Sequence, residues 1–196
     1  MALTHYNKTV LVGNEGAGKT SLIYRTQFGE FNHNATATIG ATYVKHKVYL
    51  DDGNCEVKLH LWDTAGQPRF SALLPMFIKG AKIVLVCFDS PDISLVQRHV
   101  GEIDDIDSSV RIILVMTKID KEYFSRREAM KEYAQSKNLD IFFTSSLTGE
   151  GIQELFEEVA RHYLLIDSTS DNDTFDLETT PVTNSHVMFT QCCITM

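Results

Sequence analysis

The stretch from Thr9 to Ser21, TVLVGNEGAGKTS, decides the fold of this chain. It leads from a short apolar segment, Val10–Val12, through a glycine-rich loop into Ser21–Phe28, which can form a helix. The spacing Gly-x-x-x-x-Gly-Lys-Thr is typical of a phosphate-binding loop, because backbone N–H groups and the helix N-terminus together hold phosphate oxygens. The alternative is a tight turn before an ordinary helix, and the strand-loop-helix order favours phosphate binding over it.

The composition is that of a folded chain with an acidic balance. Its 196 residues are 43% hydrophobic and 22% charged, with a formal net charge of −8. This length suffices for one domain plus a tail, and the negative charge argues against nucleic acid as a partner. No apolar run has the length of a membrane span, and the first residues lack a signal-peptide core. We therefore expect a monomeric protein that starts in the cytosol.

A hairpin and three buried strands are expected after the first helix. Tyr43–Leu50 and Val57–Trp62 alternate apolar and polar residues around Asp52-Gly53-Asn54, which is typical of a turn. Nearly continuous apolar runs suit parallel strands buried on both faces. They span residues 83–88, 112–116 and 141–143.

Helical patterns separate these strands. The pattern Ser125-x-x-Glu128 resembles a capping box that opens a helix toward Lys137, and apolar residues recur at helical spacing from Ile152 to Leu164. The alternation predicts an α/β fold of three layers, a mostly parallel six-stranded sheet with one antiparallel edge strand and helices on both faces. Ligands of such sheets lie beyond the carboxyl ends of the strands.

The last part of the chain differs from the rest in composition. Residues 167–196 hold five acidic residues, no lysine and no arginine, so they carry −5 of the total −8 and leave −3 on residues 1–166. Their apolar periodicity is too weak for a core. We expect a folded domain at residues 1–166 and a flexible acidic tail at residues 167–196.

Residues near the loop supply the other groups that a nucleoside triphosphate needs. Lys19 brings a positive charge to the β- and γ-phosphates, and the Thr20 hydroxyl can ligate Mg²⁺. Asp63 can hold the same ion, Gly66 can bring a backbone N–H to the terminal phosphate, and Gln67 can orient an attacking water. The alternative role for Asp63 is a helix cap or turn residue, which fits its position beside a phosphate loop less well.

The pattern Thr117-Lys118-x-Asp120 follows an apolar strand and predicts guanine recognition. The Asp120 carboxylate can accept both guanine N1–H and N2–H₂, whereas adenine offers no matching pair of donors. Lys118 can lay its stem over the base. Ser145 and Ser146, after the last strand, can direct a backbone N–H at the guanine oxygen.

Over residues 8–166 the chain resembles the small GTPases of the Ras superfamily, and within them the Rab family. The segments that carry the resemblance are Thr38–Tyr43 (TIGATY), Lys58–Asp63 (KLHLWD), Arg69-Phe70, Pro75–Ala81 (PMFIKGA) and the double cysteine Cys192-Cys193. Within these segments, the sequences TIGA (residues 38–41) and PMF (residues 75–77) are similar to those of the endocytic Rabs. The Thr-Lys-x-Asp form of the base motif is similar to Rho, although no insert follows it.

The resemblance implies a set of nucleotide and metal contacts. Thr38 would join Thr20 and Asp63 around Mg²⁺ in the GTP-bound state, and Phe31 would pack against the guanine. Gln67 and Lys19 would be the catalytic residues. The residues expected to contact GTP or GDP are Glu15, Gly16, Ala17, Gly18, Lys19, Thr20, Ser21, Phe31, Thr38, Asp63, Gly66, Thr117, Lys118, Asp120, Ser145, Ser146 and Leu147.

The resemblance also implies partners. Tyr43, Trp62 and Phe77 would form an aromatic triad that effector proteins bind. Tyr43 and Trp62 lie on the polar faces of paired strands, where an exposed aromatic patch is expected, and the alternative for Trp62 is a core position. An exchange factor, an activating protein and a prenyl-protein chaperone are the other partners expected.

Four departures from the family pattern concern the site. Glu15 replaces a small loop residue, and its length and charge would oppose the anionic transition state of hydrolysis unless the side chain points to solvent or reaches a cation. Pro68 replaces an acidic residue of the second switch segment, residues 63–77, and biases the residue before it away from helical conformation. Thr117 replaces asparagine, and Ser146-Leu147 replace Ala-Lys, which can loosen guanine binding without changing the base chosen.

The function expected is that of a GTP/GDP switch in vesicle or endosomal membrane traffic. GTP hydrolysis should be slow and need an activating protein, because no arginine is evident in cis. The alternative from another class is a GTP-binding interaction module that barely hydrolyses GTP because of Glu15. A nucleotide kinase is a third possibility, and the residues at 63–67 and 117–120 argue against it.

Cys192 and Cys193 predict lipidation in one of two forms, a CaaX box on Cys193 or a Rab-type double-cysteine end. One lipid chain binds membranes weakly and usually works with a basic patch, whereas this tail is acidic and opposes anionic lipid. We therefore expect two prenyl groups and a protein that cycles between the cytosol and the cytosolic face of endomembranes. The alternative is a chance cysteine pair.

Overall fold

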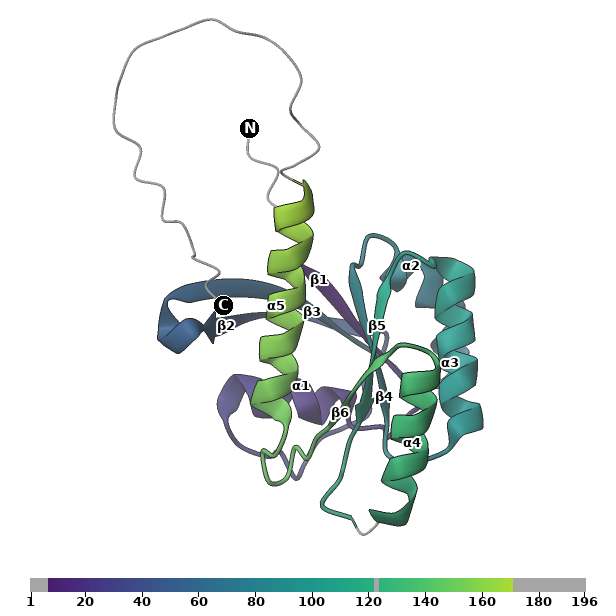
Figure 1. The fold of residues 1–196 in the computed structure, drawn as a ribbon. Coiled ribbons are helices and arrows are strands. Elements are labelled where there is room, and N and C mark those ends of the chain that lie inside the picture. The colour runs from purple at the N-terminus through teal and green to yellow at the C-terminus, as the bar shows by residue number, and fades with distance from the viewer. Residues whose placement is uncertain (1–6, 122–123, 171–196) are drawn as a thin grey trace, which may run out of the picture.

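The computed structural model describes residues 7–121 and 124–170 as an α/β fold (Figure 1). Two 3₁₀ turns, Asp51–Gly53 and Pro68–Leu73, follow β2 and β3. The strands and helices are, in chain order, β1 (Lys8–Val12), α1 (Lys19–Phe28), β2 (Ala41–Leu50), β3 (Cys55–Thr64), α2 (Leu74–Ile78), β4 (Ile83–Phe88), α3 (Ile93–Ile106), β5 (Arg111–Met116), α4 (Phe124–Ser136), β6 (Asp140–Phe143) and α5 (Ile152–Ser170). Among the described residues, no helix combines the length and apolar character that crossing a membrane requires.

The six strands form one sheet in the order β2-β3-β1-β4-β5-β6. All neighbouring pairs are parallel except β2 with β3, so β2 is an antiparallel edge strand. This confirms the predicted fold class. The parallel strands bring their carboxyl ends to one edge, where Leu11 of β1 lies between Asp63 of β3 and Leu85 of β4.

Two core layers follow from the alternation of side chains along each strand. Leu11 packs in one layer with Leu22 of α1 and Phe156 of α5, and its neighbour Val10 packs in the other with Ile78 of α2 and Ile103 of α3. In Figure 1, α1 and α5 accordingly lie on one side of the sheet, opposite α2, α3 and α4. Strands covered on both faces are apolar throughout, which explains the continuous runs in β4 and β5.

Two element boundaries differ from the sequence-based expectation. Helix α4 begins at Phe124, so Ser125 lies inside the helix and the predicted N-cap at Ser125 is wrong. Helix α5 continues to Ser170, beyond the expected end of the folded domain at Ile166. Cap patterns are local signals, and they place the end of a helix only to within one or two residues.

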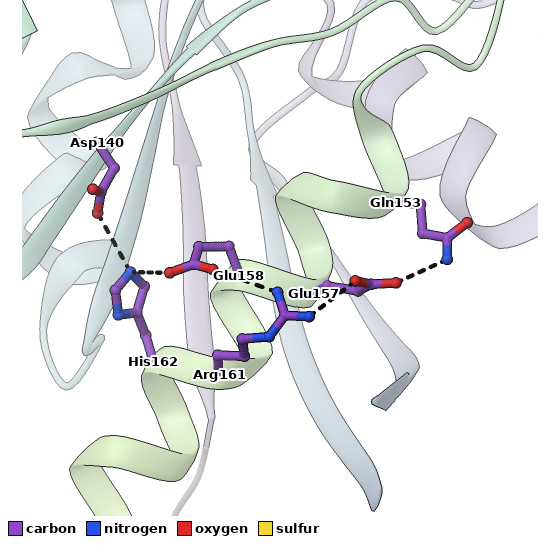
Figure 2. A network of polar contacts seen from close by, with 6 residues as sticks. All are labelled: Asp140, Gln153, Glu157, Glu158, Arg161 and His162. Carbon is purple, nitrogen blue, oxygen red and sulfur yellow. Dashed lines mark hydrogen bonds and ion pairs between the residues drawn. The ribbon is translucent and has the colours of Figure 1, made fainter. Parts of the chain in front are cut away.

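Polar side chains connect α5 to the start of β6 (Figure 2). Because the neighbouring strands are parallel, this start lies at the end of the sheet opposite the phosphate loop. His162 Nε2 lies 3.4 Å from an Asp140 oxygen and 3.5 Å from a Glu158 oxygen. Arg161 pairs with Glu157 at 3.2 Å and with Glu158 at 3.5 Å along the same helix. These contacts fix the long last helix without touching the candidate site.

Candidate functional site

The glycine-rich loop lies at the carboxyl end of β1 and can be built only with glycine at its first position. Gly13 has a φ of 145°, and a Cβ there would lie 2.0 Å from the Cys87 carbonyl oxygen of β4. Gly18, with a φ of 84°, is the N-cap of α1. The loop therefore passes close over the sheet and delivers the N-terminus of α1 to the site, as the sequence predicted.

Lys19 reaches back across the loop. Its ammonium donates to the carbonyl oxygens of Gly13 at 2.7 Å and Asn14 at 2.8 Å, and only 4% of the residue is exposed. Burial lowers the pKa of Lys19, and the negative charges of Asp63 and Glu15 oppose this shift. The ammonium is thus held by the loop where it can meet phosphate oxygens.

Three residues from separate segments converge beside Lys19. Thr20 Oγ1 donates to Asp63 Oδ2 at 2.6 Å and lies 2.7 Å from Thr38 Oγ1, which is 3.3 Å from the same carboxylate oxygen. The other oxygen, Asp63 Oδ1, is buried without a hydrogen-bond partner, and burial raises the pKa of this carboxyl. Two hydroxyls and an unsatisfied carboxylate oxygen form an all-oxygen donor set that fits Mg²⁺.

A cavity of about 320 Å³ opens above this cluster. It collects most of the predicted phosphate contacts into one concave site at the carboxyl edge of the sheet. The predicted residues that line it are Glu15, Gly16, Ala17, Gly18, Lys19, Thr20, Ser21, Thr38, Gly66, Gln67 and Lys118.

The two loops predicted to bind the guanine base, after β5 and β6, contact each other, and the first also contacts the phosphate loop. The Ser145 hydroxyl donates to Asp120 Oδ1 at 2.5 Å, and the Thr117 hydroxyl donates to the Ala17 carbonyl oxygen at 2.8 Å. Thr117, which departs from the family pattern, therefore ties the base loop to the phosphate loop. Ser146 is buried, whereas Leu147 is 48% exposed.

Asp89, directly after β4, is a site residue that the sequence reasoning missed. Its carboxylate pairs with the Lys118 ammonium at 2.8 Å. Lys118 itself has a left-handed backbone, with a φ of 55°. The position of Asp89 at the carboxyl end of a buried strand is the signal that could have identified it.

His99 is a second residue near the site that the sequence does not single out. Its Nε2 lies 3.0 Å from Asn14 Oδ1, so α3 holds the side chain of the loop residue whose carbonyl accepts from Lys19. Burial lowers the pKa of His99, with Glu102 opposing the shift. Its helical spacing with Val96 and Ile103 on the buried face is the available signal.

The predicted aromatic groups are only partly where the sequence placed them. The rings of Tyr43 and Trp62 are 5.3 Å apart, and those of Trp62 and Phe77 are 6.4 Å apart, so the three are contiguous. Tyr43 is 36% exposed and Phe77 only 9%. Phe77 lies on α2 and packs in the core layer between the sheet and α3. Phe31 lies edge-on to His33, outside the residues that line the phosphate cavity.

The second switch segment is fastened to the loop at two points. The Glu15 N–H donates to the Gly66 carbonyl oxygen at 3.0 Å, and Gln67 Nε2 donates to Glu15 Oε1 at 2.7 Å. A Cβ on Gly66 would lie 2.3 Å from the Asn14 carbonyl carbon. Gln67 is extended, with φ −76° and ψ 139°, before Pro68, as predicted. The side chain expected to orient water is instead bound to Glu15.

One comparison with protein families adds to this geometry. The sequence model of the Ras family matches residues 8–165 of the chain. The matched range begins with β1 and ends within α5, so it contains every residue of the phosphate cavity and the loops after β5 and β6.

Proposed function

The chain belongs to the Ras family, and on that premise we propose that it is a slowly hydrolysing Rab-type switch of vesicle or endosomal membranes. As a Ras-family protein it is a small GTPase. Ras-family GTPases bind guanine nucleotide with Mg²⁺ and hydrolyse GTP. The finer proposal concerns how this chain uses the site and where it acts.

The observation that carries the proposal is the convergence of Thr20, Thr38 and Asp63 beside Lys19. Thr20, Thr38 and Asp63 would hold Mg²⁺, which when bound neutralises charge on the β- and γ-phosphates. Lys19 would bind the same phosphates, and Gln67 would orient the water. Water then attacks the γ-phosphorus, the bond to the β–γ bridging oxygen breaks, and GDP and phosphate result.

Nucleotide state would be transmitted through Thr38 and Gly66. Each belongs to a loop that contacts the phosphate cavity, so γ-phosphate can order both and hydrolysis can release them. This provides the two conformations that a switch requires. An exchange factor and an activating protein would set the rates between them.

A second candidate function is a GTP-binding interaction module with very weak hydrolysis. The bond from Gln67 to Glu15 favours it, because a glutamine held by a carboxylate is not available to a water. Both candidates bind nucleotide, so only the rate of GTP hydrolysis separates them: the switch turns GTP over, and the interaction module barely does.

The membrane role is proposed from the sequence. Cys192 and Cys193 lie outside the described residues, and we infer that both carry prenyl groups, because an acidic tail leaves a single lipid without electrostatic support. A prenyl-protein chaperone and effectors at Tyr43, Trp62 and Phe77 would complete the cycle. Intact mass of cell-derived protein should show two prenyl groups, and a single farnesyl with no second lipid would contradict the inference.

The test of the nucleotide function is direct. Purified protein should carry GDP or GTP together with Mg²⁺, identified after denaturation by chromatography, and loaded GTP should decay to GDP in a single turnover. Protein that carries no guanine nucleotide and binds none would overturn the proposal. Protein that binds GTP for hours without decay would select the interaction module.

A further inference from the structure

Asn14 of the phosphate loop joins helix α3 to the Lys19 ammonium. Its main-chain carbonyl oxygen accepts from Lys19 at 2.8 Å and from the Ala17 N–H at 3.2 Å. Its side-chain oxygen lies 3.0 Å from His99 Nε2 and 3.5 Å from the Arg98 guanidinium. Because a guanidinium only donates, the atom that it shares with His99 acts as an acceptor. A change at His99 can therefore reach Lys19 through a single residue.

The contact with Asn14 fixes which nitrogen of His99 carries the hydrogen. An amide oxygen only accepts, so Nε2 donates to it, and the neutral ring keeps a lone pair on Nδ1. Nδ1 is buried 3.5 Å from a Glu102 carboxylate oxygen and has no hydrogen-bond partner among the described residues. In the neutral ring, the lone pair and the carboxylate face each other with no hydrogen between them. A proton on Nδ1 would replace this repulsion by an ion pair.

The charges around His99 keep the ring neutral near neutral pH and allow it to take up a proton below. Burial is the main cause that lowers the pKa of His99 from its ordinary value of 6.5; Glu102 opposes the shift, and the positive charges of Arg98 and Lys19 add to it. A cavity of about 240 Å³ adjoins the ring, and the second switch segment contributes only uncharged residues to its lining. Glu102 is thus the group that favours the protonated ring.

We propose that His99 is a positioning residue of the phosphate loop and that its protonation slows the release of nucleotide. The protonated ring would donate to Asn14 and to Glu102 together, and a charged donor makes the stronger hydrogen bond to Asn14. Its positive charge repels Lys19, and the anionic phosphates of a bound nucleotide offset that repulsion. Binding of nucleotide and binding of the proton therefore favour each other.

The alternative role for His99 is to fill space on the buried face of α3, together with Val96 and Ile103. A ring that only fills space gives release rates that do not depend on its protonation, so a pH profile separates the two roles. The proposal rests on the proposed function for the identity of the ligand. It adds a control on nucleotide release that acts from α3.

The test follows the release of a fluorescent GDP analogue from the full chain, with Mg²⁺ and excess unlabelled GDP, between about pH 8 and about pH 5. His99→Gln keeps a donor for Asn14 and cannot titrate in this range. Dividing its release rate by the wild-type rate cancels effects of pH on the nucleotide and on Asp63, which both proteins share. This ratio should lie close to unity at the alkaline end and rise at least about fivefold at the acidic end, a coupling at the lower end of those usual between two sites.

Three more variants complete the design. Glu102→Gln, at a side chain that is 46% exposed, should shift the slowing of release to lower pH, because the imidazolium loses its carboxylate partner. His99→Phe keeps a ring and removes the donor, so it should release nucleotide faster at every pH. The matched control His60→Gln removes an imidazole of β3 that lines neither this cavity nor the phosphate cavity, and should keep the wild-type profile.

The proposal would be overturned by a flat ratio, by an unchanged profile in Glu102→Gln, or by equal release from the wild type and His99→Phe. NMR shifts of the imidazole nitrogens test it without added nucleotide: neutral His99 should carry its hydrogen on Nε2, and a hydrogen on Nδ1 instead would also overturn it. Failure of the proposed function is distinct, because then no GDP analogue binds at any pH and both proposals fall. A flat ratio in protein that binds the analogue overturns this proposal alone.

Discussion

Replacing Glu15 with serine should speed GTP hydrolysis, because the Glu15 carboxylate holds Gln67 at 2.7 Å. A hydrogen bond to a charged group contributes about 1.5–3 kcal/mol, and an exposed carboxylate gives the low end of that range. Breaking a bond of about 1.4 kcal/mol before Gln67 can orient water slows the reaction about tenfold. Glu15→Ser should therefore raise the single-turnover rate about tenfold, measured by quenching GTP-loaded protein at intervals and separating GTP from GDP.

A double variant distinguishes capture of Gln67 from a direct effect of the Glu15 charge. Gln67→Leu should slow hydrolysis in either background, since leucine cannot orient water. If Glu15 acts by capture, Glu15→Ser gives no gain once Gln67 is leucine, whereas repulsion of the transition state by Glu15 would persist there. Equal rates for the wild type and Glu15→Ser would refute the reasoning, and would leave Glu15 as a solvent-facing loop residue.

Three further predictions concern the base, the switch contact and the core. Asp120→Asn should weaken GTP binding by about 2–3 kcal/mol, roughly a hundredfold in affinity, and should favour xanthine nucleotide. Unchanged GTP affinity in a competition assay would contradict the role of this loop in base recognition. Gly66→Ala should force residues 66–67 off the loop because its Cβ meets Asn14 at 2.3 Å, so hydrolysis should fall by about a hundredfold while hydrogen exchange in residues 63–70 rises. Burial raises the pKa of Cys87 from 9.0 to about 12. The unfolded thiol therefore ionises first, and between those pH values stability should fall by about 1.4 kcal/mol per pH unit, a slope in denaturant titrations that Cys87→Ala should reduce.

The motifs that could be predicted are those whose function is encoded within a few consecutive residues. The loop that ends at Lys19-Thr20 and the segment that begins at Asp63 each follow a strand, and parallel topology brings both to one edge of the sheet. The convergence of Thr20 and Asp63 with Thr38 follows from that edge and from the family resemblance. Local spacing was sufficient to predict these motifs, because the parallel sheet brings the ends of their strands together.

Contacts set by side-chain conformation could not be predicted in the same way. Asp89 and Lys118 are separated by a helix and a strand, and nothing in either segment alone indicates that the two charges pair. The burial of Phe77 depends on how closely α2 packs on α3. The sequence shows that Glu15 departs from the family pattern, whereas its hydrogen bond to Gln67 depends on the conformation of both side chains.

Two departures from the family pattern, Thr117 after β5 and Glu15 in the phosphate loop, have opposite consequences. Thr117 replaces the usual asparagine and yet bonds to the Ala17 carbonyl oxygen, while His99 holds Asn14 from the other side, so the loop that binds phosphate is braced from β5 and from α3. Bracing of this kind favours nucleotide affinity, since less ordering is required on binding. Glu15 lies in the same braced loop and binds Gln67, and we expect this contact to affect the rate of hydrolysis and not the affinity for nucleotide. On the proposed function, we expect a chain built this way to retain GTP and to hydrolyse it slowly, so that a partner that releases Gln67 from Glu15 would set the lifetime of the GTP-bound state.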